Sequence, residues 1–156
     1  MNTVREYVDA VANDDVRATL RWLEEAGYRV TSSRGGPTES FGNALLVFTG
    51  RREVETTRDR GQWMIGISLA PGGERLWLDV LAAARGGVAW APPPHRQPFS
   101  SPLPEQLPVD VSWSASLPEV LGWLDEPGAA EEAKAATMKA RDLMQRWWRD
   151  VGQERS

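Results

Sequence analysis

The alternation of apolar and polar side chains is clearest from Val54 to Leu69, where it predicts two antiparallel strands joined by a tight turn at Arg58-Asp59-Arg60-Gly61. Side chains of the second strand divide between two faces, with Trp63, Ile65 and Ile67 on one and Met64, Gly66 and Ser68 on the other. A period of two over this length is typical of a hairpin with one buried face. The hairpin therefore predicts an antiparallel sheet.

Shorter runs on both sides of the hairpin predict further strands. These runs are Tyr28–Arg34, Phe41–Phe48 and Arg75–Leu78. The run from Phe41 to Phe48 is apolar on both faces, as expected for a central strand. Turn residues such as Pro71-Gly72-Gly73 separate the runs. Asp79 is then expected to cap a short helix that ends at Arg85. The pattern predicts a meander of four to six antiparallel strands.

Helical periodicity predicts that helices flank this meander at both ends of the chain. The capping box Thr3-Val4-Arg5-Glu6 begins an amphipathic region of one bent helix or two short ones. Its apolar stripe continues through Val16, Leu20 and Leu23 and stops at Gly27, a favourable residue just after a helix. A last helix, over about 129–152, has an apolar stripe of Ala133, Ala136, Ala140, Leu143, Met144 and Trp147. We therefore expect one α+β domain over residues 1–156.

The chain between the sheet and the last helix has a different character. Seven of the 11 prolines lie within residues 86–108, which predicts an irregular connection because proline lacks an amide donor. The alternation of Val109, Val111 and Trp113 predicts an edge strand after it. Ser116-Leu117-Pro118-Glu119 is a second capping box, with proline in the first turn, and it predicts a short helix.

The distribution of charge adds an acidic block to this picture. The net charge is −4, and the segment from Gln97 to Ala133 has seven carboxylates and no Lys or Arg. Such a block would attract a basic partner and repel nucleic-acid phosphates, or it is a solvated surface. The arginines near the hairpin, Arg51, Arg52, Arg58 and Arg60, alternate with acids. We expect them to form ion pairs on a solvent face rather than a phosphate-binding patch.

The residues with chemical potential do not form a recognisable catalytic motif. The chain has no Cys, which excludes disulfides and thiolate metal sites, and no glycine-rich phosphate loop follows a predicted strand. The single histidine, His95, lies in the proline-rich connection, where we expect a surface role. No apolar run is long enough for a signal core or a membrane span, which predicts a cytoplasmic protein. We therefore expect neither a cofactor nor a metal.

One segment resembles a known family. Thr57-Arg58-Asp59-Arg60-Gly61-Gln62-Trp63, followed by an apolar strand and Asp79-Val80-Leu81-Ala82-Ala83-Ala84, resembles immunity proteins of bacterial polymorphic-toxin systems. The resemblance covers about Val54 to Arg85. It implies a cytoplasmic α+β protein that binds and neutralises a cognate toxin without a cofactor or catalysis. A chaperone-like or adaptor domain for an effector protein is the alternative, and a small hydrolase or transferase that uses scattered acids, arginines and His95 also stays open.

The acidic block and the abundant tryptophans predict where a protein partner would bind. The chain has eight Trp, and large aromatic side chains are common anchors of both cores and interfaces. Acidic side chains would steer a basic toxin domain, such as a nuclease, toward this surface. The predicted contact residues are Glu105, Asp110, Asp125, Glu126, Trp90 and Trp113. The partner, the binding face and the oligomeric state are not predicted.

Overall fold

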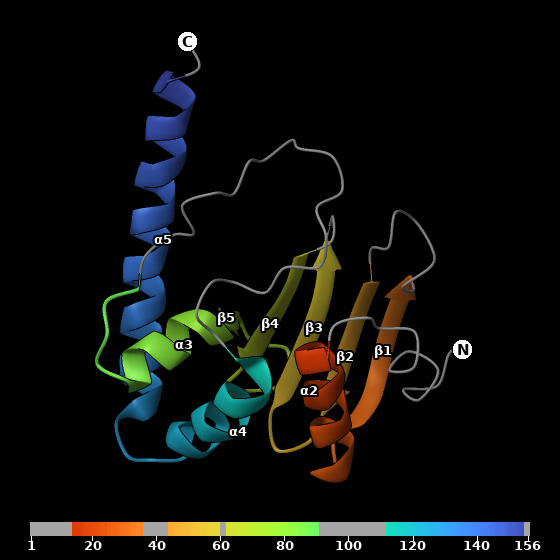
Figure 1. The fold of residues 1–156 in the computed structure, drawn as a ribbon. Helices are drawn as coiled ribbons and strands as arrows, with labels where there is room; N and C mark the ends of the chain where they lie inside the picture. The colour runs from red at the N-terminus through yellow and green to blue at the C-terminus, as the bar shows by residue number, and fades with distance from the viewer. Residues whose placement is uncertain (1–13, 36–43, 60–61, 91–111, 155–156) are drawn as a thin grey trace.

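The structure is a computed structural model that describes residues 14–35, 44–59, 62–90 and 112–154. In this part of the chain, five antiparallel strands form one sheet in sequential order, with four helices beside it (Figure 1). The strands are β1 (Arg29–Gly35), β2 (Ala44–Thr49), β3 (Glu53–Asp59), β4 (Gln62–Ser68) and β5 (Arg75–Trp77). The helices are α2 (Asp14–Glu25), α3 (Leu78–Arg85), α4 (Trp113–Leu124) and α5 (Ala129–Glu154). The predicted α+β fold with an antiparallel meander is confirmed.

The hairpin of β3 and β4 forms the centre of the core, as its alternation predicts. Its register places Val54 opposite Ile67 and Thr56 opposite Ile65. Trp63, Ile65 and Ile67 are at most 2 % exposed, so the predicted inward face of β4 is confirmed. The neighbouring strands contribute Leu46, Phe48 and Leu76 to the same hydrophobic cluster. The helices cover this face of the sheet, which we call the inner face.

Helices α2 and α4 lie in front of the sheet, and α5 lies along its β5 side (Figure 1). The predicted stripe of α2 is confirmed, because Val16, Leu20 and Leu23 are all buried, and Gly27 follows the helix with a φ of 91°. The predicted stripe of α5 is correct only in its first half. Ala133 and Ala140 are buried, whereas Leu143 is 37 % exposed because the helix continues past the strands (Figure 1).

Helix α4 begins one turn earlier than its capping box predicts. Trp113 is the first helical residue, so its prediction as part of an edge strand is wrong. The physical reason is a cap from a distant segment, because the Asp15 carboxylate accepts the amide N–H groups of Trp113 (2.7 Å) and Ser114 (3.1 Å). The hydroxyls of Ser112 and Ser114 also donate to Asp15. Asp15 thus satisfies donors that a helix start leaves open.

The prediction that Asp79 caps the short helix after β5 is also wrong. Helix α3 begins at Leu78 with Trp77 at its N-cap, so Asp79 lies within the first turn. Its carboxylate accepts a hydrogen bond of 2.9 Å from the indole Nε1 of Trp90 instead. The residues after α3, 86–90, form neither helix nor strand. The rest of the predicted connection, Val109, Val111, His95 and the Thr3–Glu6 capping box lie outside the described residues.

Asp15 is held in its charged form at the start of two helices. It lies in the first turn of α2 and accepts the first amides of α4, where the helix dipoles favour negative charge. Burial raises the pKa of Asp15, but the hydrogen bonds from Ser114, Trp113 and Ser112 together lower it by more. The pKa of Asp15 therefore lies below its ordinary value, and the carboxylate stabilises the folded state.

We expect Asp15→Ala to lower the free energy of unfolding by about 1–2 kcal/mol at neutral pH, since a helix cap is lost. Because the folded pKa is lowered, this contribution is complete above the unfolded pKa of about 3.9 and disappears as the pH falls through the folded pKa. Urea unfolding from pH 7 to pH 2 measures both effects. Asp14→Ala is the control, because Asp14 is exposed and, among the described residues, forms an ion pair with Arg17 alone, at 3.5 Å. Equal losses of unfolding free energy in the two variants would contradict the capping role of Asp15.

Candidate functional site

The four predicted contact residues that the structure describes do not lie together on one surface. Glu105 and Asp110 lie outside the described residues. Trp113 begins α4, whereas Asp125 and Glu126 follow its last residue. A helix of 12 residues is about 18 Å long. The structure therefore divides the predicted residues between a tryptophan-lined pocket at the start of α4 and an acidic corner at its end.

The acidic corner consists of Asp125, Glu126, Glu131 and Glu132, between the end of α4 and the first turns of α5. Asp125 is held in place by two arginines from the β2–β3 turn. Arg51 Nη1 lies 3.1 Å from Asp125 Oδ2, and Arg52 Nη2 lies 2.9 Å from Oδ1. Asp125 therefore contributes to the shape of the corner, and its charge is balanced within the protein.

Arg52 is the more important of the two arginines for this geometry. Its side chain is only 16 % exposed, compared with 80 % for Arg51. Besides Asp125, its guanidinium donates to the carbonyl oxygens of Leu124 (3.1 Å) and Leu69 (3.3 Å). A positive charge beside the last carbonyls of α4 is favourable. Arg52 thus joins the end of α4 to the β2–β3 turn and to the residue after β4.

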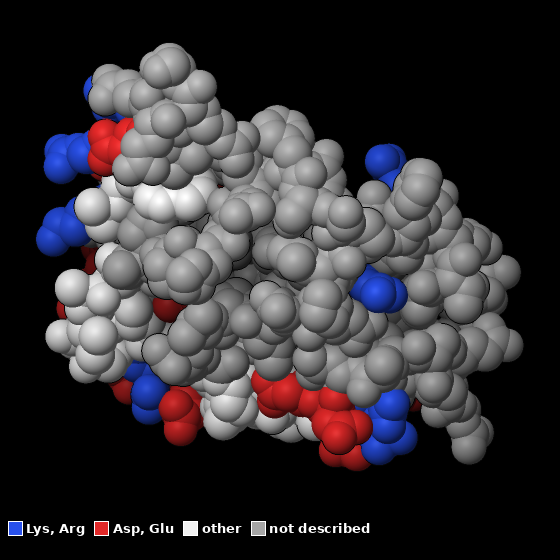
Figure 2. Space-filling view, turned by 45° about the horizontal axis from the view of Figure 1, so that its top comes forward, with Lys and Arg blue, Asp and Glu red and all other residues white. Residues whose placement is uncertain are grey.

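The remaining carboxylates of the acidic corner are available to solvent. Glu126, Glu131 and Glu132 are exposed, and none forms an ion pair with another described residue, whereas Glu119 pairs with Arg85 at 3.0 Å. In Figure 2, several basic side chains of the described residues lie along the left border and others lie toward the right, whereas acidic ones lie mostly along the lower border. Helix α5 carries the basic residues Lys134, Lys139, Arg141, Arg146 and Arg149. Acidic and basic surfaces are thus partly separated.

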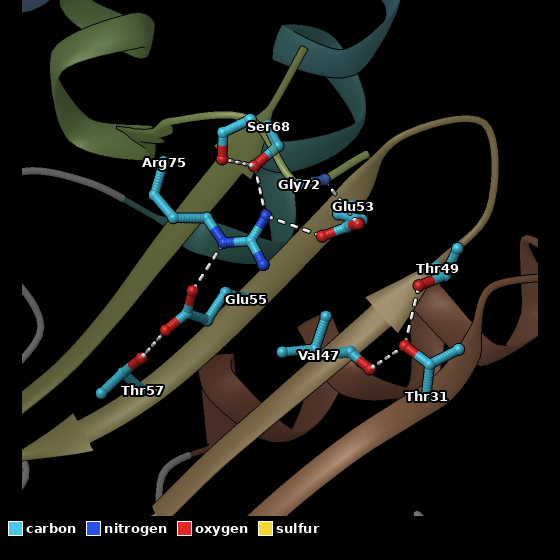
Figure 3. Close-up of polar contacts among 10 residues, drawn as sticks. Thr31, Val47, Thr49, Glu53, Glu55, Thr57, Ser68, Gly72 and Arg75 are labelled. Carbon is cyan, nitrogen blue, oxygen red and sulfur yellow. Dashed lines mark hydrogen bonds and ion pairs between the residues drawn. The ribbon is translucent and has the colours of Figure 1, made fainter. Parts of the chain in front are cut away.

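The acids of β3 form ion pairs on a solvent face, but with Arg75 rather than with the hairpin arginines that the sequence predicts, of which Arg60 lies outside the described residues. Arg75 of β5 reaches across β4 to Glu53 (2.9 Å) and Glu55 (2.6 Å) of β3, on the outer face of the sheet (Figure 3). Gly66 of β4 makes this crossing possible, because a Cβ there would lie 3.1 Å from the Cβ of Arg75. Arg58, in contrast, lies with its guanidinium 6.0 Å from the ring centre of Trp63.

The pair of carboxylates on β3 is suited to ion pairing rather than to acid–base chemistry. The hydrogen bond from Arg75, and a second from the Gly72 amide, hold the pKa of Glu53 below its ordinary value. Burial lowers the pKa of Arg75, but its bonds to Glu55 and Glu53 raise it by more. Thr57 donates to the other oxygen of Glu55 at 3.2 Å. A general acid at neutral pH needs a raised pKa, which is the opposite of the shift at Glu53.

The two predicted tryptophans, Trp90 and Trp113, lie away from the acidic corner and line a pocket of about 320 Å³. Its walls come from β4, β5, α3 and α5, and they are mainly apolar, with Met64, Trp77 and Met144. Trp113 is 2 % exposed, so it packs in the core and presents only part of its surface to the pocket. The sequence predicts Trp77 and Met144 as members of a strand and of a helix stripe, but it has no signal that brings them together.

The described residues offer no site for a metal ion, since no group of three His, Asp or Glu side chains lies close enough to hold one. No helix in the described part of the chain is long and apolar enough to cross a membrane. Comparisons of the chain with models of protein families, with curated proteins and with solved structures find no match. Function is therefore inferred from the chain's own residues.

We expect Arg52→Ala to lower the free energy of unfolding by about 1–3 kcal/mol, since three hydrogen bonds of a half-buried charge are lost. Arg51→Ala is the matched control and should cost less than about 1 kcal/mol, as is usual for an exposed ion pair. Urea unfolding of the two variants at pH 7 gives the comparison. A similar cost for both would show that Arg52 does not hold the corner.

Proposed function

We propose that this protein binds another protein without catalysing a reaction, and that it neutralises a basic toxin domain in the cytoplasm. This is the role of the immunity proteins that its hairpin resembles. The observation that carries the proposal is the acidic corner, where Glu126, Glu131 and Glu132 are exposed and form no ion pair with a described residue. These three carboxylates are available to a partner.

A rigid frame supports the three carboxylates. Arg51 and Arg52 fix Asp125 at the end of α4, and the turn to α5 is closed by the Ala129 amide, which donates to the Glu126 carbonyl at 3.2 Å. A surface that is already ordered loses less conformational freedom when a partner binds. The frame therefore favours the acidic corner as a docking surface over a flexible acidic tail.

The charge of the corner indicates the chemistry of the partner. An enzyme that acts on nucleic acid has a basic surface that neutralises phosphates. Carboxylates on a rigid protein surface can occupy such a surface, and their long-range attraction speeds the encounter of the two proteins. A nuclease-like toxin domain is therefore the partner that this corner would fit.

The two alternative functions make different demands. An adaptor or chaperone-like domain would bind an effector protein and leave its activity intact, whereas an immunity protein abolishes it. A hydrolase or transferase would need a carboxyl group with a raised pKa, and the β3 pair is bound by Arg75 with the pKa of Glu53 lowered. The pKa shift of Glu53 is therefore opposite to the one that a general acid needs.

The partner to test is the C-terminal domain of a large secreted protein encoded next to this one. We expect the purified protein to bind this domain and to abolish its activity when the two are mixed in equal amounts. Binding without inhibition would support the adaptor instead. Failure to bind any such neighbouring domain would overturn the proposal.

The double charge reversal Glu126→Lys with Glu131→Lys tests the binding face. We expect association to slow about 10-fold and to depend less on salt concentration, because electrostatic steering is lost. The control, Asp142→Lys with Asp150→Lys, makes the same change of net charge at exposed positions of α5. Association rates at low and high salt are measured for both. If the two double variants behave alike, the acidic corner is not the contact.

A further inference from the structure

We propose that the open edge of the sheet, along β1, binds an extended acidic segment of another protein, which adds to the sheet as a further strand. This surface is separate from the acidic corner, and the proposal does not depend on the proposed toxin partner. The sheet has β1 at one edge and β5 at the other, and α3 and α5 contact β5 (Figure 1). Among the described residues, β1 pairs with β2 alone, so its second side is open.

The alternation of backbone groups across the sheet shows which residues of β1 face the open edge. Residues opposite each other in antiparallel strands alternate between hydrogen-bonded and non-hydrogen-bonded pairs. Asp59 and Gln62 close a hairpin with two loop residues, and such a closing pair is hydrogen-bonded. Counted from this pair through the registers of β3 and β2, the backbone of Ser32 faces β2 and that of Ser33 faces the open edge.

A side-chain contact supports this assignment. Thr31 Oγ1 donates to the carbonyl oxygen of Val47 at 3.5 Å, so this carbonyl of β2 points toward β1 (Figure 3). Val47 lies opposite Ser32, and the next residue, Ser33, therefore directs its N–H and C=O away from β2. Ser33 is exposed, and its backbone forms no hydrogen bond with a described residue outside the sheet. Open backbone groups of an edge strand are a template for a further strand.

Two arginines of β1 determine the charge of the added strand. Arg29 and Arg34 are exposed, and neither forms an ion pair with a described residue. They lie opposite Thr49 and Leu45 on the outer face of the sheet, and β1 contains no acidic residue. A second copy of β1 at this edge would bring its own arginines close to these two, and like charges across an interface are unfavourable. An acidic strand would instead pair with both arginines.

The register of β2 gives the spacing of the acidic residues. Thr49 and Leu45 are four positions apart, whereas the arginines opposite them are five apart, because the register shifts at Thr31. A regular strand at the open edge likewise meets the two arginines at positions i and i+4. These positions share one face, since side chains of a strand alternate. The partner is therefore an extended segment with Asp or Glu at i and i+4.

The experiment compares three acetylated and amidated peptides on the unaltered protein. The first is Thr-Glu-Val-Thr-Val-Glu-Thr, the second, with its acids on opposite faces, is Thr-Glu-Val-Thr-Glu-Val-Thr, and the third, without acids, is Thr-Gln-Val-Thr-Val-Gln-Thr. We expect the first to bind more tightly than the second and about 3- to 10-fold more tightly than the third at low salt, the effect of two exposed ion pairs. High salt should reduce these differences.

Titration followed by NMR of the ¹⁵N-labelled backbone amides locates the bound peptide. We expect a saturable shift of the Ser33 amide signal with the first peptide and no shift at the acidic corner. Equal binding of the three peptides, the absence of a saturable shift, or shifts confined to residues outside β1 would overturn the proposal.

Charge variants test the role of the two arginines. Arg29→Gln with Arg34→Gln should remove the preference for the first peptide over the third. The control, Arg146→Gln with Arg149→Gln, makes the same change of net charge at exposed positions of α5 and should retain the preference. A preference that survives the β1 double variant would contradict the proposed ion pairs.

A backbone variant tests strand addition itself. Ser33→Pro removes an amide that faces the open edge, where proline is compatible with an edge strand, so we expect it to weaken the first peptide at least 3-fold while the circular dichroism of the sheet is unchanged. Sedimentation of the peptide-free protein tests the other occupant. Unchanged peptide binding by a folded Ser33→Pro variant, or dimers of the unaltered protein that protect the Ser33 amide, would overturn the proposal.

Discussion

The carboxylate of Asp15 is the contact on which the positions of both candidate sites depend. It lies in the first turn of α2 and accepts the first two amides of α4, so it fixes where α4 begins. From that start, Trp113 enters the core and the wall of the pocket. At the other end of the same helix, Asp125 meets Arg51 and Arg52. One charged cap thus aligns an apolar pocket and an acidic corner on a single rigid element.

Pairing within the protein decides which charges can act on a partner. The acidic block has seven carboxylates between Gln97 and Ala133, but Asp125 and Glu119 are paired with arginines from other elements. On the outer face, Arg75 holds both Glu53 and Glu55. The acids of the corner that have no such pair with a described residue, Glu126, Glu131 and Glu132, therefore matter more for the proposed function than the total charge does. The same reasoning makes Arg141 and Asp79 weak candidates for charged ligand contacts, since each has a partner.

Local patterns predict the fold well, and long-range contacts explain where they fail. The alternation of Trp63, Ile65 and Ile67 predicts the correct buried face, because every second side chain of a strand points to the same side of the sheet. The capping box at Ser116–Glu119 gives a start for α4 that is one turn late, since the true cap, Asp15, lies about a hundred residues earlier in the chain. Sequence also selects Trp90 and Trp113, which line one pocket, yet it cannot show that Trp77 and Met144 face them. The spacing of residues along the chain does not reveal contacts between segments that are distant in the sequence.

The proposed function requires that the partner cover the acidic corner and leave the outer face of the sheet open. Hydrogen–deuterium exchange of the protein, alone and with the toxin domain, tests this most directly. We expect slower exchange at the turn Asp125–Gly128 and in the first turn of α5 when the toxin domain is bound, with no change along β3. Slower exchange along β3, with the corner unchanged, would contradict the proposed binding face.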